Sequence, residues 1–382
     1  MGLGVAGKKR VAVLGATGSI GKSTLDVIEK GRDDFDIVLL TAHCDRAGLE
    51  KAGLAWPDAV KVLSGSAGRQ RLLDAIAACR ADVVVNGICG AAGLEPSMAA
   101  IEAGADLALA NKETLVMAGG LVTQRAREKK KRILPVDSEH SAVFALIAAH
   151  APGFAGCELS VQAPETVEEI ILTASGGPFR DKTMEEMAKA TAKDALAHPT
   201  WNMGAKISVD SATMANKGLE VIEAARLFNF PPERIKVTVH RQSIVHSMIR
   251  MRDGAVYAQL SRPDMRHPIH QALYPGMVKK ADFGRLDFDN LSLDFCRPDM
   301  QRFPLLGLAY LAAQKGGLYP CAYNAANEVA VDAFLAGRIG FLDIAGITDY
   351  ILGRDWSADP ETLPAVMEAD MLARSMANKE IH

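Results

Sequence analysis

The stretch 12-AVLGATGSIGKSTLDVI-28 decides the fold, because it places a glycine-rich turn between an apolar strand and a helical pattern. From Gly15, the letters G-A-T-G-S-I-G are typical of the turn that binds a dinucleotide. From Ala16, A-T-G-S-I-G-K-S falls one glycine short of the phosphate loop of triphosphatases, G-x-x-x-x-G-K-[ST]. Both interpretations place a phosphate at a helix N-terminus, where free N–H groups favour an anion. A tight turn without a ligand is the third possibility.

The segments that follow favour the dinucleotide interpretation. Apolar runs of strand length alternate with helical patterns, and they begin with 10-RVAVLG, 36-DIVLLTA, 59-AVKVL, 82-DVVVNG, 106-DLALA and 132-RILPVD. Such alternation predicts a doubly wound α/β domain, Rossmann-like, with a parallel sheet covered on both faces, over residues 1–137. The second run continues as 36-DIVLLTAHCDR and ends in Asp45 and Arg46. This is ~20 to 25 residues after the glycine turn, where dinucleotide domains hold the adenine ribose. A triphosphatase that depends on Lys22 stays an alternative.

The pattern changes after residue 137. Residues 138–274 mix a strand that ends in 173-TASGGPFR, one long helical pattern from 206 to 228, and three strands, the last two joined by an Asp253-Gly254 hairpin turn. This mixture predicts an α+β catalytic domain. Residues 275–302 carry turn residues and little periodicity, as a linker does. Four helical patterns within residues 303–382 predict a C-terminal helical bundle.

Composition indicates an ordinary soluble protein, with 49% hydrophobic and 23% charged residues in 382 positions. The net charge of −3 gives no signal for nucleic acid, and no apolar run reaches the ~20 residues of a membrane span. The first strand begins too early to leave room for a cleaved leader. Six dispersed cysteines without a C-x-x-C pair argue against structural zinc and suit a reducing cytoplasm.

Polar residues follow two of the expected strands at the edge where parallel sheets bind ligands. Asn111, Lys112 and Glu113 follow the fifth strand, and Asp137 and Glu139 follow the sixth. If the extended conformation persists, the carboxylates of Asp137 and Glu139 point to the same side. Carboxylates without His or Cys suit Mg²⁺ or Mn²⁺. The alternative is that Asp137 or Ser138 only caps the next helix.

Three further segments add candidate ligand groups. In 211-SATMANKGLE, helical spacing places Asn216 and Glu220 on one face with Lys217 at its border, which offers a third carboxylate. Ser175 opens a Ser-Gly-Gly turn that can present donors to a phosphate, and His198 and Trp201 stand in a stretch able to close over a substrate. Each of these patterns also fits a solvent-facing surface, a plain turn or ordinary packing.

The segments GATGSIG, NKET, PVDSEH, TASGGPFR, HPTWNMGAKISVDSATMANKGLE, HRQSIVHSMI, PDMR and NAANE occur in this order from about residue 10 to 335. Their combination resembles the 1-deoxy-D-xylulose 5-phosphate reductoisomerase family of the non-mevalonate isoprenoid pathway. The resemblance implies an NADPH- and metal-dependent enzyme that rearranges and reduces a small phosphorylated sugar. It also implies a homodimer, paired through the strands of the middle domain.

The resemblance assigns residues to three groups. The metal carboxylates are Asp137, Glu139 and Glu220, for Mg²⁺ or Mn²⁺. Substrate contacts are Lys112 and Ser138 at the reacting end, Ser175, Ser211, Asn216 and Lys217 around the phosphate and hydroxyls, and His198 with Trp201 and Met203 in a lid. Cofactor contacts are Thr17, Gly18, Ser19, Ile20, Asn111, Glu113 and Gly204.

One segment departs from the family. Where the family often carries Gly-Lys-Asn for the 2′-phosphate of NADPH, this chain has His43-Cys44-Asp45 followed by Arg46. Asp45 by itself favours the 2′-hydroxyl of NADH, whereas His43 or Arg46 can replace the missing cation. We expect NADPH. A non-catalytic protein that senses NADPH without needing the carboxylates stays the second alternative.

Overall fold

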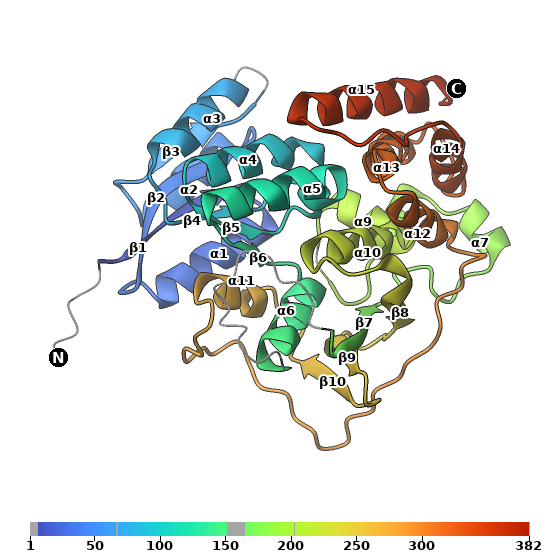
Figure 1. Cartoon of the computed structure of the whole chain (residues 1–382), viewed down its shortest axis with the longest axis horizontal. Helices are drawn as coiled ribbons and strands as arrows, with labels where there is room; N and C mark the ends of the chain where they lie inside the picture. Colours follow the sequence, from blue (N-terminus) through green and yellow to red (C-terminus); the bar gives the residue numbers. More distant parts are fainter. Residues whose placement is uncertain (1–6, 66–67, 151–164, 202, 382) are drawn as a thin grey trace.

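The first part of the chain forms a six-stranded parallel sheet (Figure 1). The computed structural model describes residues 7–65, 68–150, 165–201 and 203–381. The strand order is β3-β2-β1-β4-β5-β6, which is the dinucleotide-binding order. The strands are β1 (Lys9–Leu14), β2 (Phe35–Ala42), β3 (Val60–Leu63), β4 (Val83–Asn86), β5 (Asp106–Leu109) and β6 (Ile133–Pro135). All six match the predicted runs, and the doubly wound fold is confirmed.

Helices cover the faces of this sheet because its central strands β1, β4 and β5 are mostly apolar and buried. They are α1 (Ser19–Lys30), α2 (Arg46–Gly53), α3 (Arg69–Ala78), the 3₁₀ turn η1 (Ala91–Gly93), α4 (Leu94–Glu102) and α5 (Lys112–Lys129). The turn from β1 to α1 needs its glycines: Gly15 has φ of +79°. A Cβ at Gly21 would lie 2.3 Å from the Gly15 carbonyl oxygen, so a side chain there would push α1 away from β1.

The middle part forms a four-stranded mixed sheet in the order β10-β9-β7-β8. Its strands are β7 (Val167–Ala174), β8 (Ile235–Val239), which follows the 3₁₀ turn η2 (Pro232–Arg234), β9 (Val245–Met251) and β10 (Val256–Leu260). The predicted hairpin joins β9 and β10, with Gly254 at φ of +88°. Helix α6 (Ser138–His150) packs against β9 and β10. Helix α6 therefore connects the last strand of the first sheet, β6, to the second sheet.

The long helical pattern from 206 to 228 is two helices, so the prediction of a single one is wrong. Helix α9 (Ala205–Ala212) ends before Met214, whose φ of +60° is left-handed, and α10 (Ala215–Leu227) begins after it. The hydroxyl of Thr213 accepts the Ala215 N–H at 3.3 Å and covers the break. Neither glycine nor proline marks it, and the apolar spacing continues across it. Two short helices, α7 (Met184–Ala188) and α8 (Ala192–Leu196), precede α9.

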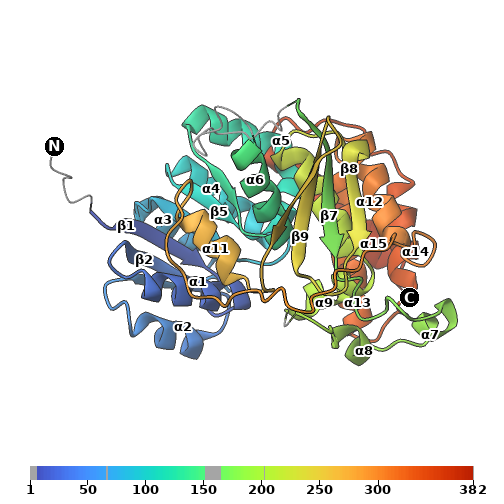
Figure 2. The same ribbon diagram turned by 90° about the horizontal axis from the view of Figure 1, so that it is seen from below.

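The segment after the second sheet returns to the first one. Helix α11 (Arg266–Leu273) packs against α1 and α6, and Arg266 pairs with Asp26 of α1 at 2.8 Å. From there, residues 274–303 run without a helix. As Figure 2 shows, the segment first passes α11 and α1, where Lys279 pairs with Asp34 at 3.2 Å, and then follows the second sheet, where Cys296 bridges to Val239 of β8. The linker over residues 275–302 stays a prediction, and the structure shows no named helix or strand between α11 and residue 304; α11 itself was not predicted.

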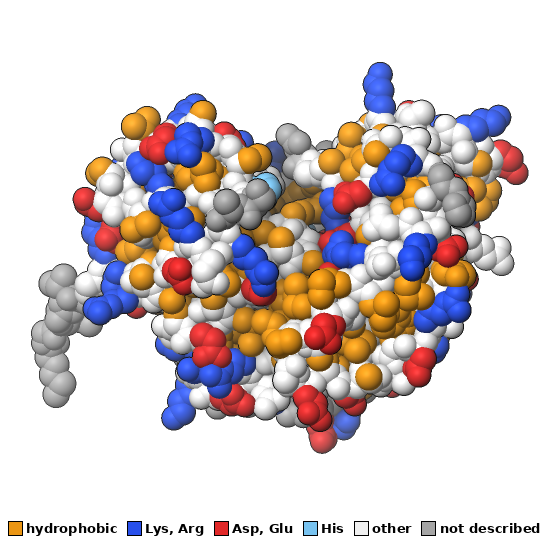
Figure 3. All heavy atoms as spheres, turned by 90° about the horizontal axis from the view of Figure 1, so that it is seen from above, with side chains coloured by type: hydrophobic (Ala, Val, Ile, Leu, Met, Phe, Trp, Pro, Cys, Tyr) orange, Lys and Arg blue, Asp and Glu red, His pale blue; other side chains and the backbone are white. Residues whose placement is uncertain are grey.

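Four helices complete the chain, as predicted: α12 (Pro304–Lys315), α13 (Tyr319–Leu335), α14 (Asp343–Leu352) and α15 (Leu363–Lys379). Helix α13 is buried along most of its length and contacts α5, α9 and α10, so the C-terminal part is joined to both sheets. Seen from the side of α3 and α15, the surface is hollowed between the two lobes, with Lys and Arg side chains on both sides of the hollow (Figure 3). Among the described residues, no helix combines the length and apolar character that crossing a bilayer requires.

Candidate active site

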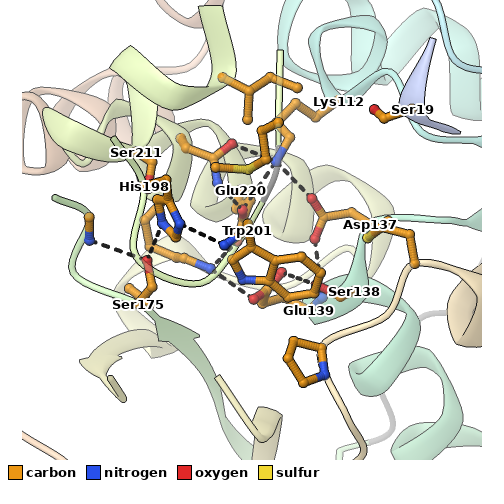
Figure 4. A pocket seen from close by; sticks show the side chains of 18 of the residues that line it. Ser19, Lys112, Asp137, Ser138, Glu139, Ser175, His198, Trp201, Ser211 and Glu220 are labelled. Carbon is orange, nitrogen blue, oxygen red and sulfur yellow. Dashed lines mark hydrogen bonds and ion pairs between the residues drawn. The ribbon is translucent and has the colours of Figure 1, made fainter. Parts of the chain in front are cut away.

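A pocket of about 320 Å³ lies where the two sheets meet (Figure 4). Residues from the N-terminus of α1, from the segments after β5, β6 and β7, and from α9 and α10 line it. Its polar lining consists of Ser19, Ser23, Lys112, Asp137, Ser138, Glu139, Ser175, His198, Ser211, Asn216, Lys217, Glu220 and Asp264. Most of the predicted catalytic and metal-binding residues therefore share one cavity, at the carboxyl end of the parallel sheet.

The three predicted metal carboxylates come together. One oxygen each of Asp137, Glu139 and Glu220 lies within 4.8 Å of the other two. The reason differs from the predicted one, because the extended conformation does not continue past Asp137. Helix α6 begins at Ser138, and Asp137 Oδ1 accepts the Glu139 N–H at 3.1 Å. The helix-cap role and the place in the acidic cluster, weighed as alternatives from the sequence, belong to the same side chain.

Two buried lysines neutralise this cluster. The Lys112 ammonium donates to Asp137 Oδ2 at 2.7 Å, to Asn216 Oδ1 at 2.8 Å and to Glu220 Oε1 at 3.1 Å. The Lys217 ammonium contacts Glu220 and lies 3.6 Å from Glu139 Oε1. Since like charges this close repel strongly in a buried site, the lysines are what allow the carboxylates to converge.

A histidine and a fourth carboxylate complete the cluster, and the sequence reasoning did not assign either of them. The ring of His140 places Nδ1 3.1 Å from Asp137 Oδ1 and Nε2 3.0 Å from the carbonyl oxygen of Glu220. Both partners only accept, so both ring nitrogens donate and the ring is an imidazolium. Glu223 Oε2 lies 3.5 Å from Nδ1. The signals were present: His140 stands in 136-VDSEH, and Glu223 is one helical turn beyond Glu220.

The pKa values reflect this crowding. Burial raises the pKa of Glu139 to about 8, with the neighbouring carboxylates adding to it. Burial alone would lower the pKa of His140, but the Glu223 and Asp137 carboxylates outweigh it and raise that pKa to about 9. For Asp137, the cations Lys112 and His140 overcome the effect of burial and hold the pKa well below its usual value. One end of the pocket is therefore a dense array of opposite charges.

The other end of the pocket is neutral and built for hydrogen bonding. His198 Nδ1 accepts the N–H groups of Thr200 at 3.1 Å and Trp201 at 2.8 Å, so Nε2 carries the proton and donates to Ser175 Oγ at 2.9 Å. Burial lowers the pKa of His198 to about 4. A Cβ at Gly177 would lie 2.4 Å from the Ser211 carbonyl oxygen, so only glycine lets β7 end this close to α9. Ser175, Ser211 and His198 are thereby gathered, as Figure 4 shows.

The donor set of the charged end fits a hard divalent cation. It offers three carboxylates, and among the described residues that line the pocket the only sulfur atoms are those of methionines. Carboxylate oxygens at this spacing are what Mg²⁺ and Mn²⁺ prefer. The residues present therefore fit the metal that the sequence predicts.

Comparisons with known proteins show which family the chain belongs to. Family models described as 1-deoxy-D-xylulose 5-phosphate reductoisomerase match residues 11–64 and 47–119, and those of its C-terminal domains match residues 133–228 and 260–376. The reductoisomerase of Treponema denticola is 46% identical, with 97% of each chain covered. The chain belongs to the 1-deoxy-D-xylulose 5-phosphate reductoisomerase family.

Solved structures of the family share the whole fold. The Zymomonas mobilis reductoisomerase in complex with NADPH is 41% identical, with a TM-score of 0.87 over 98% of this chain and 99% of that one. A reductoisomerase in complex with NADPH, fosmidomycin and magnesium is 36% identical, with a TM-score of 0.88 over 98% of both chains. Family membership decides the opening stretch in favour of the dinucleotide turn, and the match to the triphosphatase loop is coincidental.

Of the residues predicted to contact the cofactor, some line the pocket and others lie outside its lining. Ser19 and Ile20 line the pocket, and Thr17 and Gly18 stand in the turn just before them. Three more lie outside the lining, in the elements that border it. Asn111 is buried, accepts the Thr114 N–H at 3.0 Å as the cap of α5, and donates to Glu113 Oε2 at 2.9 Å. Gly204 is the N-cap of α9.

The segment that departs from the family lies at the end of β2, outside this pocket. His43, Asp45 and Arg46 are all exposed. Asp45 Oδ1 accepts the Gly48 N–H at 2.8 Å as the N-cap of α2. Its carboxylate is thus partly neutralised by a helix N-terminus, which weakens the argument that it selects the 2′-hydroxyl of NADH.

Several lining residues have no place in the sequence-based assignment. Pro263, Asp264 and Met265 stand just before α11 and line the pocket, and Ile207 and Met214 line it from α9 and from the break after it. The first three belong to the segment PDMR, which the family resemblance had marked without a role. Trp201 and Met203, assigned to the lid, do line the pocket.

Proposed function

We propose that this chain is an NADPH- and divalent-metal-dependent enzyme that converts 1-deoxy-D-xylulose 5-phosphate to 2-C-methyl-D-erythritol 4-phosphate. The observation that carries this proposal is the pocket itself. It joins an acidic cluster suited to a hard cation, a neutral hydrogen-bonding end and the N-terminus of α1 in one cavity. An unrelated activity would not need all three in a member of this family.

The reaction breaks one C–C bond of the substrate, forms another to give a branched aldehyde phosphate, and reduces that aldehyde to an alcohol. When bound, the divalent cation supplies Lewis-acid polarisation of the substrate oxygens, and NADPH supplies the hydride. Asp137, Glu139 and Glu220 would hold the cation. Lys112 and Ser138 line the pocket beside them, and we assign them to the carbonyl and hydroxyl oxygens at the reacting end.

The neutral end is suited to the substrate phosphate. Ser175 and Ser211 offer hydroxyl donors, and the Gly176-Gly177 turn presents its backbone. His198 Nε2–H can transfer its hydrogen bond from Ser175 to a phosphate oxygen without changing its protonation state. Asn216 and Lys217 stand between the two ends and contact both the acidic cluster and the pocket. We assign Trp201 and Met203 to covering the bound substrate.

We assign the cofactor to the carboxyl edge of the first sheet. The turn Thr17–Ile20 would face the pyrophosphate, since free N–H groups at the start of α1 favour an anion. Asn111, Glu113 and Gly204 would border the nicotinamide half. His43 and Arg46 would supply the positive charge for the 2′-phosphate, because the Asp45 carboxylate is engaged as a helix cap.

Three further properties complete the proposal. We assign cofactor binding to residues 1–137 and catalysis to residues 138–274, followed by a linker at residues 275–302 and a helical domain at residues 303–382. A homodimer is supported by β10, which is the edge strand of the second sheet among the described residues and on which Val256 and Tyr257 are 44% and 41% exposed. A cytoplasmic location is supported by the cysteines, since Cys44, Cys89 and Cys296 are free and exposed. We expect Mn²⁺ to serve as well as Mg²⁺.

The test is oxidation of NADPH, followed by absorbance, with and without 1-deoxy-D-xylulose 5-phosphate and with Mg²⁺ or Mn²⁺. We expect oxidation only when substrate and metal are both present, and a much slower reaction with NADH. The product is then identified by mass and by NMR. If neither NADPH nor NADH is oxidised, the assignment is overturned. ATP hydrolysis that depends on Lys22 would restore the triphosphatase alternative.

A further inference from the structure

A second buried cluster of charges lies outside the lining of the pocket, around Lys206 of α9. Its ammonium lies 2.6 Å from Glu113 Oε1, 3.0 Å from Asp210 Oδ2 and 4.0 Å from Glu328 Oε1. Burial alone would lower the pKa of Lys206, but the three carboxylates outweigh it and hold that pKa well above its usual value. Of this cluster, the function proposed above assigns a role to Glu113 alone, at the border of the cofactor site.

Glu328 connects the cluster to the C-terminal helices. It ends the segment 324-NAANE-328 of α13, which the family resemblance marked and to which no role is assigned. Its Oε1 accepts the Ala91 N–H at 3.0 Å, and its Oε2 pairs with Arg374 of α15 at 2.5 Å. A Cβ at Gly90 would lie 2.9 Å from Glu328 Oε1, so the backbone after β4 approaches this carboxylate as closely as glycine permits.

The two asparagines of the same segment serve the same cluster. Asn327 Nδ2 donates to Asp210 Oδ1 at 2.7 Å, and Asn324 Nδ2 donates to Glu328 Oε1 at 3.2 Å. Both asparagines are completely buried. A buried polar side chain is costly unless it is hydrogen-bonded, and here all three polar residues of NAANE are directed to the partners of Lys206.

The cluster reaches both borders of the proposed cofactor site. On one side, Glu113 follows Lys112 directly and is bonded to Asn111, while Gly90 and Ala91 follow β4 at the same edge of the sheet. On the other side, Lys206 follows Gly204 by two residues, where the segment carrying His198 and Trp201 enters α9. A single carboxylate, that of Glu328, therefore bears on both borders at once.

We infer that Glu328 is a positioning residue for NADPH. It fixes the backbone at Gly90–Ala91 and the Lys206–Glu113 pair, so that the edge of the first sheet and the start of α9 keep the spacing that the cofactor needs. Asn327 supports it by holding Asp210. The inference rests on the proposed function, because it takes residues 111–113 and 204 as the border of the cofactor site.

The experiment measures the dissociation constant of NADPH, from the fluorescence of the bound cofactor, in full-length variants. Glu328→Ala removes both the acceptor for Ala91 and the charge, and we expect the dissociation constant to rise by about ten-fold. Glu328→Gln keeps an acceptor for Ala91, so here the dissociation constant of NADPH should rise by only about three-fold. The KM for NADPH should follow the same order, while kcat at saturating NADPH changes less than KM.

The matched control is Asp370→Asn. Asp370 pairs with Arg374 at 2.7 Å, within the same group of charges, but it contacts neither Lys206 nor the backbone after β4. We expect it to lower the melting temperature and to leave the dissociation constant of NADPH unchanged. Equal dissociation constants in the wild type, Glu328→Ala and Glu328→Gln would show a purely structural role and overturn the inference. If Glu328→Ala does not fold, the nearly isosteric Glu328→Gln decides alone. A wild-type protein that does not bind NADPH would instead overturn the proposed function.

Discussion

Two buried clusters of carboxylates and ammonium groups begin at neighbouring residues of α5, Lys112 and Glu113. The first gathers Asp137, Glu139 and Glu220 and lines the pocket. The second gathers Glu113, Asp210 and Glu328 around Lys206 and does not contribute to that lining. Their composition is nearly the same, although we assign chemistry to one and positioning to the other.

The difference lies in how fully the carboxylate oxygens are bonded. In the Lys206 cluster, protein donors reach both oxygens of Glu113, both of Asp210 and both of Glu328. In the pocket cluster, protein donors also reach both oxygens of Asp137 and Glu220, but the nearest cation to Glu139 Oε1 among the described residues is the Lys217 ammonium, at 3.6 Å. This cluster also lines the pocket, so a cation can reach it, whereas the carboxylates of the Lys206 cluster lie outside that lining. The bonding state and access of a charged cluster thus indicate its role better than its residue types do.

The largest effect is expected for Glu220→Gln. This change removes one negative charge from the cation site, and turnover should fall by on the order of 10³-fold, with much weaker metal binding. NADPH binding should stay within about two-fold of the wild type, because Glu220 lies outside the cofactor border. Steady-state kinetics over a Mn²⁺ titration measure both. Unchanged turnover at limiting Mn²⁺ would remove Glu220 from the metal site.

Lys206→Met should lower the free energy of unfolding more than it lowers turnover. Removing the lysine leaves three buried carboxylates without their common partner, a loss of about 3–5 kcal/mol in the free energy of unfolding. Urea denaturation measures it. Added Mg²⁺ should not restore the loss, since the oxygens that Lys206 leaves, Glu113 Oε1 and Asp210 Oδ2, lie outside the lining of the pocket through which a cation can enter. Restoration by Mg²⁺ would make the Lys206 cluster a second cation site.

For Lys112→Met, in contrast, added Mg²⁺ should restore stability. The loss of stability should be smaller than for Lys206→Met, and Mg²⁺ should recover most of it, because the freed oxygens of Asp137 and Glu220 face a cavity that a cation can enter. Turnover should still fall, since Lys112 is assigned to the substrate. Urea denaturation with and without MgCl₂ gives the comparison, and an equal loss in both conditions would contradict it.

The smallest effect concerns the neutral end of the pocket. The pKa of His198 is lowered to about 4 from its ordinary 6.5, so between these values the unfolded chain binds more protons at this residue than the folded one. Acidification through this window therefore reduces the stability of the free protein. NMR titration of the histidine ring should place the midpoint near 4 in the free protein. A midpoint near 6.5 would contradict the neutral, buried ring described here.

Much of this could be predicted from the sequence. The six parallel strands followed from buried apolar runs, and the convergence of Lys112, Asp137 and Glu220 followed from strand ends and helical spacing together with the family resemblance. Local spacing places His140 one helical turn after Asp137, but it could not reveal the partners of His140 in α10, which are distant in sequence. It also could not reveal the break at Met214, where the apolar pattern is continuous. The NAANE segment is the clearest case. Its three polar residues look like an exposed helix face in the sequence. Only the packing of α13 against α5 and α9 shows that Asn324 and Asn327 are buried, and that the side chain of Glu328 is 12% exposed and paired with Arg374.

The central claim is that only one of the two clusters accepts a cation. The most direct test counts Mn²⁺ sites by electron paramagnetic resonance in metal-free protein and in two matched variants, one from each cluster. We predict one tight site per chain in the wild type and in Glu113→Gln, and its loss in Glu220→Gln. Loss of the site in Glu113→Gln with retention in Glu220→Gln would contradict the account.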